Sequence, residues 1–156
     1  MVMKKDCIFC KIVKGDAPCH KIWEDKKHLA FLSPFPNTEG FSVVITKEHF
    51  SSYAFNLSDE ILSELVIASK KVAKLIDSKL KDVGRTGMIF EGFGVDHVHA
   101  KLFPMHNTSD MEKWKEIKSN VNKYFERYEG YISSHDYKRE DDENLRKLAE
   151  KIRREV

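Results

Sequence analysis

The sequence predicts an α+β fold in which an antiparallel sheet packs against one long helix. Short segments rich in β-branched and aromatic residues occur in groups, separated by polar or proline-containing turns, as between residues 19 and 46. Residues 58–80 differ, because their apolar side chains recur at intervals of three and four, the spacing of an amphipathic helix. Strands that are grouped along the chain, and do not alternate with helices, are typical of antiparallel α+β folds.

The strands of this sheet are expected in two hairpin-like pairs and one single segment. Residues 19–23 and 28–32 flank a polar turn and should pair with each other. After a loop with two prolines, residues 41–45 (Phe-Ser-Val-Val-Ile) have the composition of a buried strand. Residues 88–90 and 97–103 then form the second predicted pair.

The predicted helix has both a start signal and an apolar stripe. Ser58 is a suitable N-cap, and Asp59 and Glu60 place negative charge in the first turn, where it suits the helix dipole. The residues of the stripe are Leu62, Leu65, Val66, Val72, Ala73, Ile76 and Leu80.

Three further elements are expected beyond Asn107. Met111, Trp114 and Ile117 have the spacing of an amphipathic helix, residues 131–137 could add a strand, and residues 140–156 have the composition of a charged closing helix. We expect residues 107–156 to be a helical extension of a single domain that spans residues 1–156.

Composition and charge exclude several classes of protein. The chain has 156 residues, of which 41% are hydrophobic and 33% charged, an ordinary balance for one globular domain. Its net charge is only +2, so neither nucleic acid nor an anionic membrane is expected as a partner. No apolar run approaches the roughly 18 residues that span a bilayer. Three cysteines and no expected signal peptide indicate a cytoplasmic protein that uses cysteine for metal or redox chemistry.

Residues 96–103 (Asp-His-Val-His-Ala-Lys-Leu-Phe) form the first segment with potential chemistry. Because side chains alternate across a strand, His97, His99 and Lys101 should share one face. Imidazole attacks phosphorus near neutral pH, and the phosphoimidazole that results is readily hydrolysed. A neighbouring ammonium group can neutralise the charge that develops, so the row fits attack on an α-phosphate. The alternative is a solvated strand face that happens to hold histidines.

Cys7 and Cys10 form the second segment, a C-x-x-C sequence. Two cysteines at this spacing can bind one tetrahedral ion and leave two positions for distant ligands, commonly histidine. A redox pair is a weaker interpretation, because the strand-then-helix context of such motifs is missing at this place in the chain. Two buried thiols without a ligand are the remaining alternative.

Three segments together resemble the zinc-containing bacterial proteins of the histidine triad superfamily. Residues 7–18 (CIFCKIVKGDAP) look like the start of those proteins. Residues 40–49 (GFSVVITKEH) resemble their Gly-His-Thr-Leu-Val-Ile-Pro-Lys-x-His segment, and residues 97–104 (HVHAKLFP) resemble their His-x-His-x-His signature. The three matches keep the family's order and spacing and cover residues 7–105.

The resemblance implies a fold and a metal site. The fold is a five-stranded antiparallel half-sheet with the long helix packed on it, and the sheet continues across a two-fold homodimer. The metal is a structural zinc ion with a closed ligand set of two sulfur and two nitrogen atoms. The family's ligand positions fall here on Cys7, Cys10, His49 and His97.

The resemblance also implies an activity and a nucleotide or dinucleotide as the partner. The middle histidine of the family signature is the nucleophile, and His99 matches it. It would attack an α-phosphate and form a nucleotidyl-histidine intermediate that water then hydrolyses. Family substrates are nucleoside phosphoramidates, aminoacyl-adenylates and dinucleoside polyphosphates, and some members transfer the nucleotidyl group to a second phosphate. His99 and Lys101 are the expected catalytic residues.

This sequence departs from the family pattern at several positions. Lys101 replaces the third histidine, and lysine cannot relay a proton at neutral pH unless its pKa is lowered. Phe41 replaces the histidine that orients the nucleophile, and residues 90–96 replace the polar phosphate-binding loop. Ser33 stands where a ribose-binding acid is usual. The substrate contacts are expected from Lys101, His106, Ser33 and Asn37.

Two consequences of these departures are open at this point. Glu91 and Asp96 would repel phosphate if both faced it, so at least one should have a structural role, for instance as the partner of a zinc-bound imidazole. The departures also support a second hypothesis from a different functional class. In it, the chain is a catalytically weak, zinc-stabilised nucleotide-binding or partner-binding module.

Overall fold

A computed structural model of the chain describes residues 2–110, 116–128 and 143. The chain divides into two compact units, Met1–Trp114 and Lys115–Val156. In the second unit, residues 116–128 hold no helix or strand, so Ile117 is not helical, contrary to the sequence prediction. Met111, Trp114, the strand predicted at 131–137 and all of the closing helix except Glu143 lie outside the described residues. The single-domain organisation stays a prediction.

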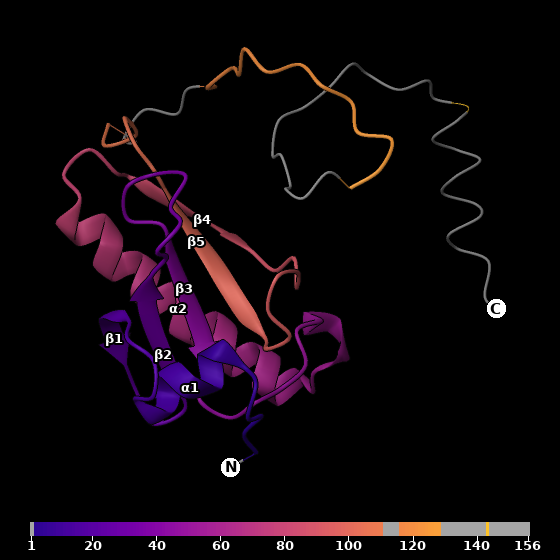
Figure 1. Cartoon of the computed structure of the whole chain (residues 1–156). Coiled ribbons are helices and arrows are strands. Elements are labelled where there is room, and N and C mark those ends of the chain that lie inside the picture. The colour runs from indigo at the N-terminus through magenta and orange to yellow at the C-terminus, as the bar shows by residue number, and fades with distance from the viewer. Residues whose placement is uncertain (1, 111–115, 129–142, 144–156) are drawn as a thin grey trace. The chain divides into compact units, whose positions relative to one another are not determined.

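The first unit contains a five-stranded sheet whose neighbouring strands all pair antiparallel, as predicted (Figure 1). The order across the sheet is β1-β2-β3-β5-β4. The strands are β1 His20–Glu24, β2 His28–Leu32, β3 Ser42–Thr46, β4 Arg85–Ile89 and β5 His99–Met105.

Two strands start two or three residues away from the predicted position, for local reasons. β4 begins at Arg85, three residues before the predicted start, because main-chain pairing with β5 extends it through Arg-Thr-Gly, which has no apolar pattern. β5 begins at His99 and not at His97. The strand therefore starts at the predicted nucleophile, and His97 belongs to the segment that leads into it.

One face of the sheet is covered by the long helix α2, Asp59–Lys79. The Ser58 side chain accepts a hydrogen bond from the backbone N–H of Ile61, which confirms the predicted cap. The buried side of α2 packs against alternate residues of the central strands, and together they form the main core. Its fully buried members include Leu65, Val72, Val44, Ala100 and Leu102. None of the helices in the described residues is long and apolar enough to cross a membrane.

The opposite face is partly covered by a short helix that the sequence analysis did not identify, α1, Ile8–Lys14. Phe9 and Cys10 of α1 pack on Phe31 and Ile45 of the sheet. The helix ends at Gly15, whose φ of 83° is the left-handed conformation that glycine adopts most easily. Figure 1 shows α1 and α2 on the two sides of the sheet, so one face carries α2 and the other carries α1 and the C-x-x-C cysteines.

His106 joins three separate segments just beyond the end of β5. Its Nδ1 lies 2.9 Å from Oδ2 of Asp82, and its Nε2 lies 3.0 Å from the backbone oxygen of Glu39. Both partners are acceptors, so only the protonated ring can donate at both nitrogens. The Glu39 carbonyl and the Asp82 carboxylate accordingly raise the pKa of His106.

Replacing His106 with alanine should destabilise the protein more in acid than in base. The folded-state pKa lies above the unfolded value of about 6.5, so the contact stabilises fully below that pH and is lost as pH rises through the folded pKa. The loss in urea midpoint should therefore be larger near about pH 5.5 than near about pH 9. His20→Ala, which changes an exposed histidine, is the matched control. An equal loss at both pH values would contradict the double donation.

Candidate active site and metal site

Four residues from separate parts of the first unit meet on the α1 side of the sheet: Cys7, Cys10, His49 and His97. Their ligand atoms all lie within 4.8 Å of one another. The three closest sulfur–nitrogen pairs are Cys7 Sγ to His97 Nδ1 at 3.4 Å, Cys10 Sγ to His49 Nδ1 at 3.5 Å and Cys10 Sγ to His97 Nδ1 at 3.6 Å. A tetrahedral zinc site with ordinary bond lengths has a sulfur–nitrogen separation of about 3.5 Å. The geometry therefore fits a four-coordinate metal site made of the four residues that the family resemblance implied.

The ring of His97 is held in the orientation that a metal ligand needs. Its Nε2 lies 2.8 Å from the backbone oxygen of Thr46, which can only accept, so Nε2 carries the proton. Nδ1 then presents its lone pair to the two cysteine sulfurs. Burial lowers the pKa of His97 to about 4, so the ring is neutral at neutral pH.

Asp96 has a structural role, but it is not the expected partner of a zinc-bound imidazole. Its carboxylate accepts the backbone N–H of Ser52 at 3.1 Å and pairs with the Lys4 ammonium at 3.0 Å. The Thr46 carbonyl supplies the imidazole contact instead. A backbone acceptor of this kind has no side-chain signature, so the sequence could not indicate it.

His99 lies at the start of β5, opposite Ile45 of β3, and its side chain is almost completely buried. Its Nδ1 lies 2.7 Å from the backbone oxygen of His97, which again can only accept. Nε2 is therefore the unprotonated nitrogen of the neutral ring. Burial lowers the pKa of His99, which keeps the ring neutral and its Nε2 lone pair available at neutral pH. The His97 carbonyl thus orients His99. This contact takes the place of the orienting histidine that the family resemblance implies, a position that Phe41 occupies here.

The surroundings of His99 combine apolar rings with one cation. The ring of Phe9 meets that of His99 edge-on, with centroids 5.4 Å apart. Phe41 and Phe103 stack with centroids 4.6 Å apart. Strand alternation places Lys101 and Phe103 on the same face as His99. The face therefore offers flat apolar surface beside a nucleophilic nitrogen and an ammonium group.

Lys101 is paired with Glu91, a contact that the sequence analysis did not find. The Lys101 side chain is 23% exposed and that of Glu91 is 10% exposed, so the pair is largely removed from water. Burial lowers the pKa of Lys101. Gly92, with φ of 74°, holds the backbone after Glu91 against Ser52, where an added Cβ would lie 3.0 Å from the Ser52 carbonyl oxygen. A phosphate that reaches Lys101 must compete with this carboxylate.

The other predicted substrate-binding residues are Ser33, Asn37 and His106, and they lie in three different parts of the first unit. The N–H of Ser33 donates to the carbonyl of Phe41, which continues the β2–β3 pairing and brings Ser33 beside the aromatic stack. Asn37 is exposed in the loop that follows. His106 lies seven residues beyond His99, roughly 23 Å at about 3.3 Å per residue. The structure thus brings Lys101 close to His99 but does not bring His106 there.

Comparison with known proteins agrees with this geometry. A family model described as HIT domain matches residues 14–108, well over half of the chain. The chain belongs to the HIT family. It is 44% identical over 102 residues to an adenosine 5'-monophosphoramidase of Schizosaccharomyces pombe, a match that covers 65% of this chain and 75% of that protein.

Two solved HIT structures share the fold of this chain. A member of the family from Bacillus subtilis has a TM-score of 0.64 at 26% identity, and the match covers 95% of each chain. A zinc-bound histidine triad protein from Mycobacterium smegmatis has a TM-score of 0.62 at 25% identity, with 67% of this chain and 78% of that chain covered. The chain therefore adopts the HIT fold, and its Cys7, Cys10, His49 and His97 fit the zinc-containing type.

Removing metal should destabilise the protein through the four-residue site alone. Treatment with a strong chelator should lower the thermal midpoint by about 10 °C, as expected for the loss of a few kcal/mol. Cys10→Ser should show a lowered midpoint before the chelator and little further change after it. Cys19→Ser removes a cysteine outside the cluster and should respond as the unaltered chain does. The site would be excluded as a metal site if the chelator had the same effect on Cys10→Ser and Cys19→Ser.

Proposed function

We propose that this HIT protein hydrolyses or transfers nucleotides through attack of His99 Nε2 on an α-phosphate. The hydrogen bond from His99 Nδ1 to the His97 carbonyl carries this proposal, because it leaves Nε2 as the nucleophilic nitrogen. Burial keeps that nitrogen unprotonated. Similarity to an adenosine 5'-monophosphoramidase supports a nucleoside phosphoramidate as substrate, and a dinucleoside polyphosphate has the same reactive α-phosphate.

The reaction is a double displacement. The Nε2 lone pair forms a bond to the α-phosphorus, and the bond from phosphorus to the leaving amine or phosphate breaks. Water then attacks the nucleotidyl-His99 intermediate, breaks the phosphorus–nitrogen bond and returns the neutral ring. Lys101 would offset the charge on the phosphate oxygens in both steps. It acts as a cation in this scheme, so the leaving amine takes its proton from solvent water in the first step, and the attacking water releases one to solvent in the second.

Apolar rings and one hydroxyl group would bind the rest of the nucleotide. Phe41 and Phe103 present stacked rings suited to a base or ribose. Ser33 lies beside them and is our candidate for a ribose contact. Roles for Asn37 and His106 in substrate binding stay predictions, as do a cytoplasmic location and a homodimer in which the sheet continues across the two-fold axis.

We propose zinc as the ion of the metal site and a structural role for it. Two thiolates and two imidazoles are the ligand set that zinc prefers, and four such ligands leave no position for water or substrate. Bound zinc would connect Cys7 and Cys10 of the α1 region to His97. The backbone oxygen of His97 is the acceptor that orients His99, so the site would stabilise the position of the nucleophile.

His99→Ala should abolish the covalent intermediate. A single-turnover reaction with adenosine phosphoramidate, and in parallel with diadenosine tetraphosphate, should give a nucleotidyl adduct on the unaltered protein, detected by mass spectrometry without acid. The variant should show no adduct and a rate lower by about 10³-fold or more. His20→Ala, at an exposed position on β1, should react normally. No adduct and no product from folded, zinc-loaded protein would instead favour the binding module.

Lys101→Met should lower kcat/KM by about 10²-fold, because it removes the cation next to the attacked phosphate. Lys101→Arg keeps the charge and should recover part of the loss. Glu91→Gln removes the competing carboxylate and should lower KM with little change in kcat. Steady-state kinetics on one phosphoramidate substrate would measure all three. An unchanged kcat/KM in Lys101→Met would show that the cation has no role.

A further inference from the structure

A groove of about 350 Å³ lies on the α2 side of the sheet, away from the face that carries His99. It is lined by the β1–β2 turn, the end of β3 with the residues after it, and the beginning of α2. His28 and Thr46, two of its lining residues, pair with each other, and the next residues on that face, Ala30 and Val44, belong to the core under α2. The groove has the size of a small-molecule pocket, which begins at about 300 Å³.

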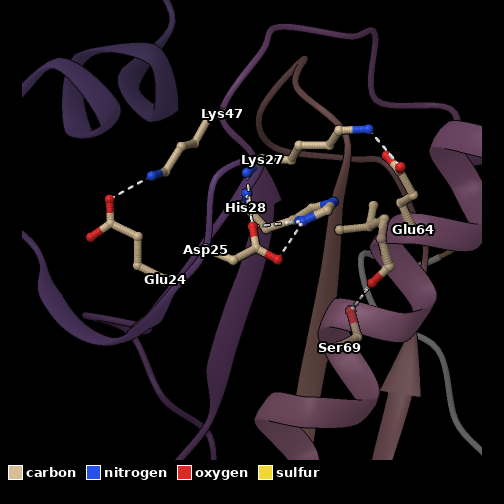
Figure 2. Close-up of polar contacts among 8 residues, drawn as sticks. Glu24, Asp25, Lys27, His28, Lys47, Glu64 and Ser69 are labelled. Atoms are coloured by element: carbon tan, nitrogen blue, oxygen red, sulfur yellow. Dashed lines mark hydrogen bonds and ion pairs between the residues drawn. The ribbon is translucent and has the colours of Figure 1, made fainter.

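A buried histidine forms part of the groove wall and is fixed by a carboxylate. The His28 side chain is only 5% exposed, and its Nδ1 lies 3.1 Å and 3.3 Å from the two oxygens of Asp25 (Figure 2). Asp25 also accepts the backbone N–H groups of Lys27 at 2.8 Å and His28 at 2.6 Å. Burial raises the pKa of Asp25, but these hydrogen bonds lower it by more, so the carboxylate stays ionised. An ionised carboxylate only accepts, so the Nδ1 of His28 carries a proton.

The second nitrogen of His28 has no hydrogen-bond partner among the described residues, since all printed polar contacts of the ring are made by Nδ1. No buried side-chain nitrogen or oxygen in the described part of the chain lacks a partner. Nε2 must therefore reach solvent, and the groove that His28 lines is its route. When the ring is neutral, this nitrogen is a hydrogen-bond acceptor at the groove wall, and the Asp25 contact at Nδ1 holds the ring in place.

The charges around the groove balance each other. Three lysines and three glutamates line it: Lys26, Lys27, Lys47, Glu48, Glu60 and Glu64. Figure 2 shows Lys27 reaching from the turn to Glu64 of α2, where the two charged groups lie 2.5 Å apart. Lys47 pairs with Glu24, also at 2.5 Å. Phosphate or another anion would meet the glutamates, and a cation would meet the lysines, so the lining favours an uncharged ligand.

The remaining wall is apolar. Phe50 and Ile61 line the groove from opposite elements, the segment after β3 and the first turns of α2. The methylene stems of the paired lysines add further apolar surface, while their ammonium groups pair with Glu64 and Glu24. Apolar walls that include the Phe50 ring, together with one acceptor, suit a ring compound with one donor.

We propose that this groove is a second ligand site, which binds a small, uncharged, flat ring compound through one N–H or O–H group donated to His28 Nε2. The ligand class follows from the directed acceptor, the apolar walls and the balanced charges. The site lies on the opposite face from His99 and does not depend on the proposed reaction there.

The proposal is tested with two probes that differ only in the donor. Indole has a ring N–H, and 1-methylindole has the same flat apolar body without it. On full-length, zinc-loaded protein labelled with ¹⁵N-histidine, indole should bind with a dissociation constant of about 1 mM or lower and shift the Nε2 resonance of His28. 1-Methylindole should bind at least about tenfold more weakly, because it leaves the acceptor without a partner.

Variants separate this site from the rest of the protein. His28→Phe keeps a flat ring but removes the acceptor, so the preference for indole over 1-methylindole should disappear. His20→Phe, on the neighbouring strand and exposed, should keep the preference. The comparison of the two probes on unaltered protein stands even where His28→Phe fails to fold. Equal affinity for both probes, or shifts that centre on His99 and not on His28, would overturn the proposal.

Discussion

The position of His97 is the constraint on which the rest of the site depends. Its ring places Nδ1 beside Cys7 and Cys10, and its Nε2 proton is held by the Thr46 carbonyl. Its own carbonyl fixes the tautomer of His99. Side chain and backbone of one residue thus connect a metal site with a nucleophile two residues away. Any change that rotates this peptide unit would alter the candidate metal site and the orientation of the proposed nucleophile together, so a structural ion bound here would stabilise both.

Burial lowers the pKa of His97, His99 and Lys101 on this face, but the consequence differs between imidazole and ammonium. Removing imidazole from water favours its neutral form, which is the form that binds a metal or attacks phosphorus. The same burial disfavours the ammonium of Lys101, and Glu91 compensates by pairing with it. The pair keeps a cation at the edge of a dry, apolar face in the absence of substrate. A phosphate could then replace the carboxylate as the partner of Lys101, so the lysine would lose little solvation when substrate binds.

Local sequence patterns predicted the sheet and the long helix, because both depend on periodicity. The grouping of the metal ligands came from the family resemblance, since the C-x-x-C spacing alone does not identify the distant ligands. They did not reveal α1, since a seven-residue helix with only Phe9 and Cys10 buried has no periodic stripe. The pairs Lys101–Glu91 and His106–Asp82 were missed for another reason. Each pair joins polar residues that are distant in the sequence and that meet only through the register of β4 and β5 or the path of a loop. A local sequence pattern does not encode such a contact. The bond that orients His99 involves a backbone oxygen, which every residue has.

The two faces of the sheet present two histidines with the same internal arrangement and different surroundings. In both His99 and His28, Nδ1 donates to a fixed acceptor, so Nε2 is the ring nitrogen left for a substrate or ligand. Attack on a phosphate needs more than this nitrogen, because negative charge on the phosphate oxygens must be offset nearby. His99 has Lys101 on its own strand face, whereas the groove at His28 is lined by three glutamates as well as three lysines. In our two proposals, the environment and not the imidazole geometry therefore distinguishes a nucleophile on one face from a hydrogen-bond acceptor on the other.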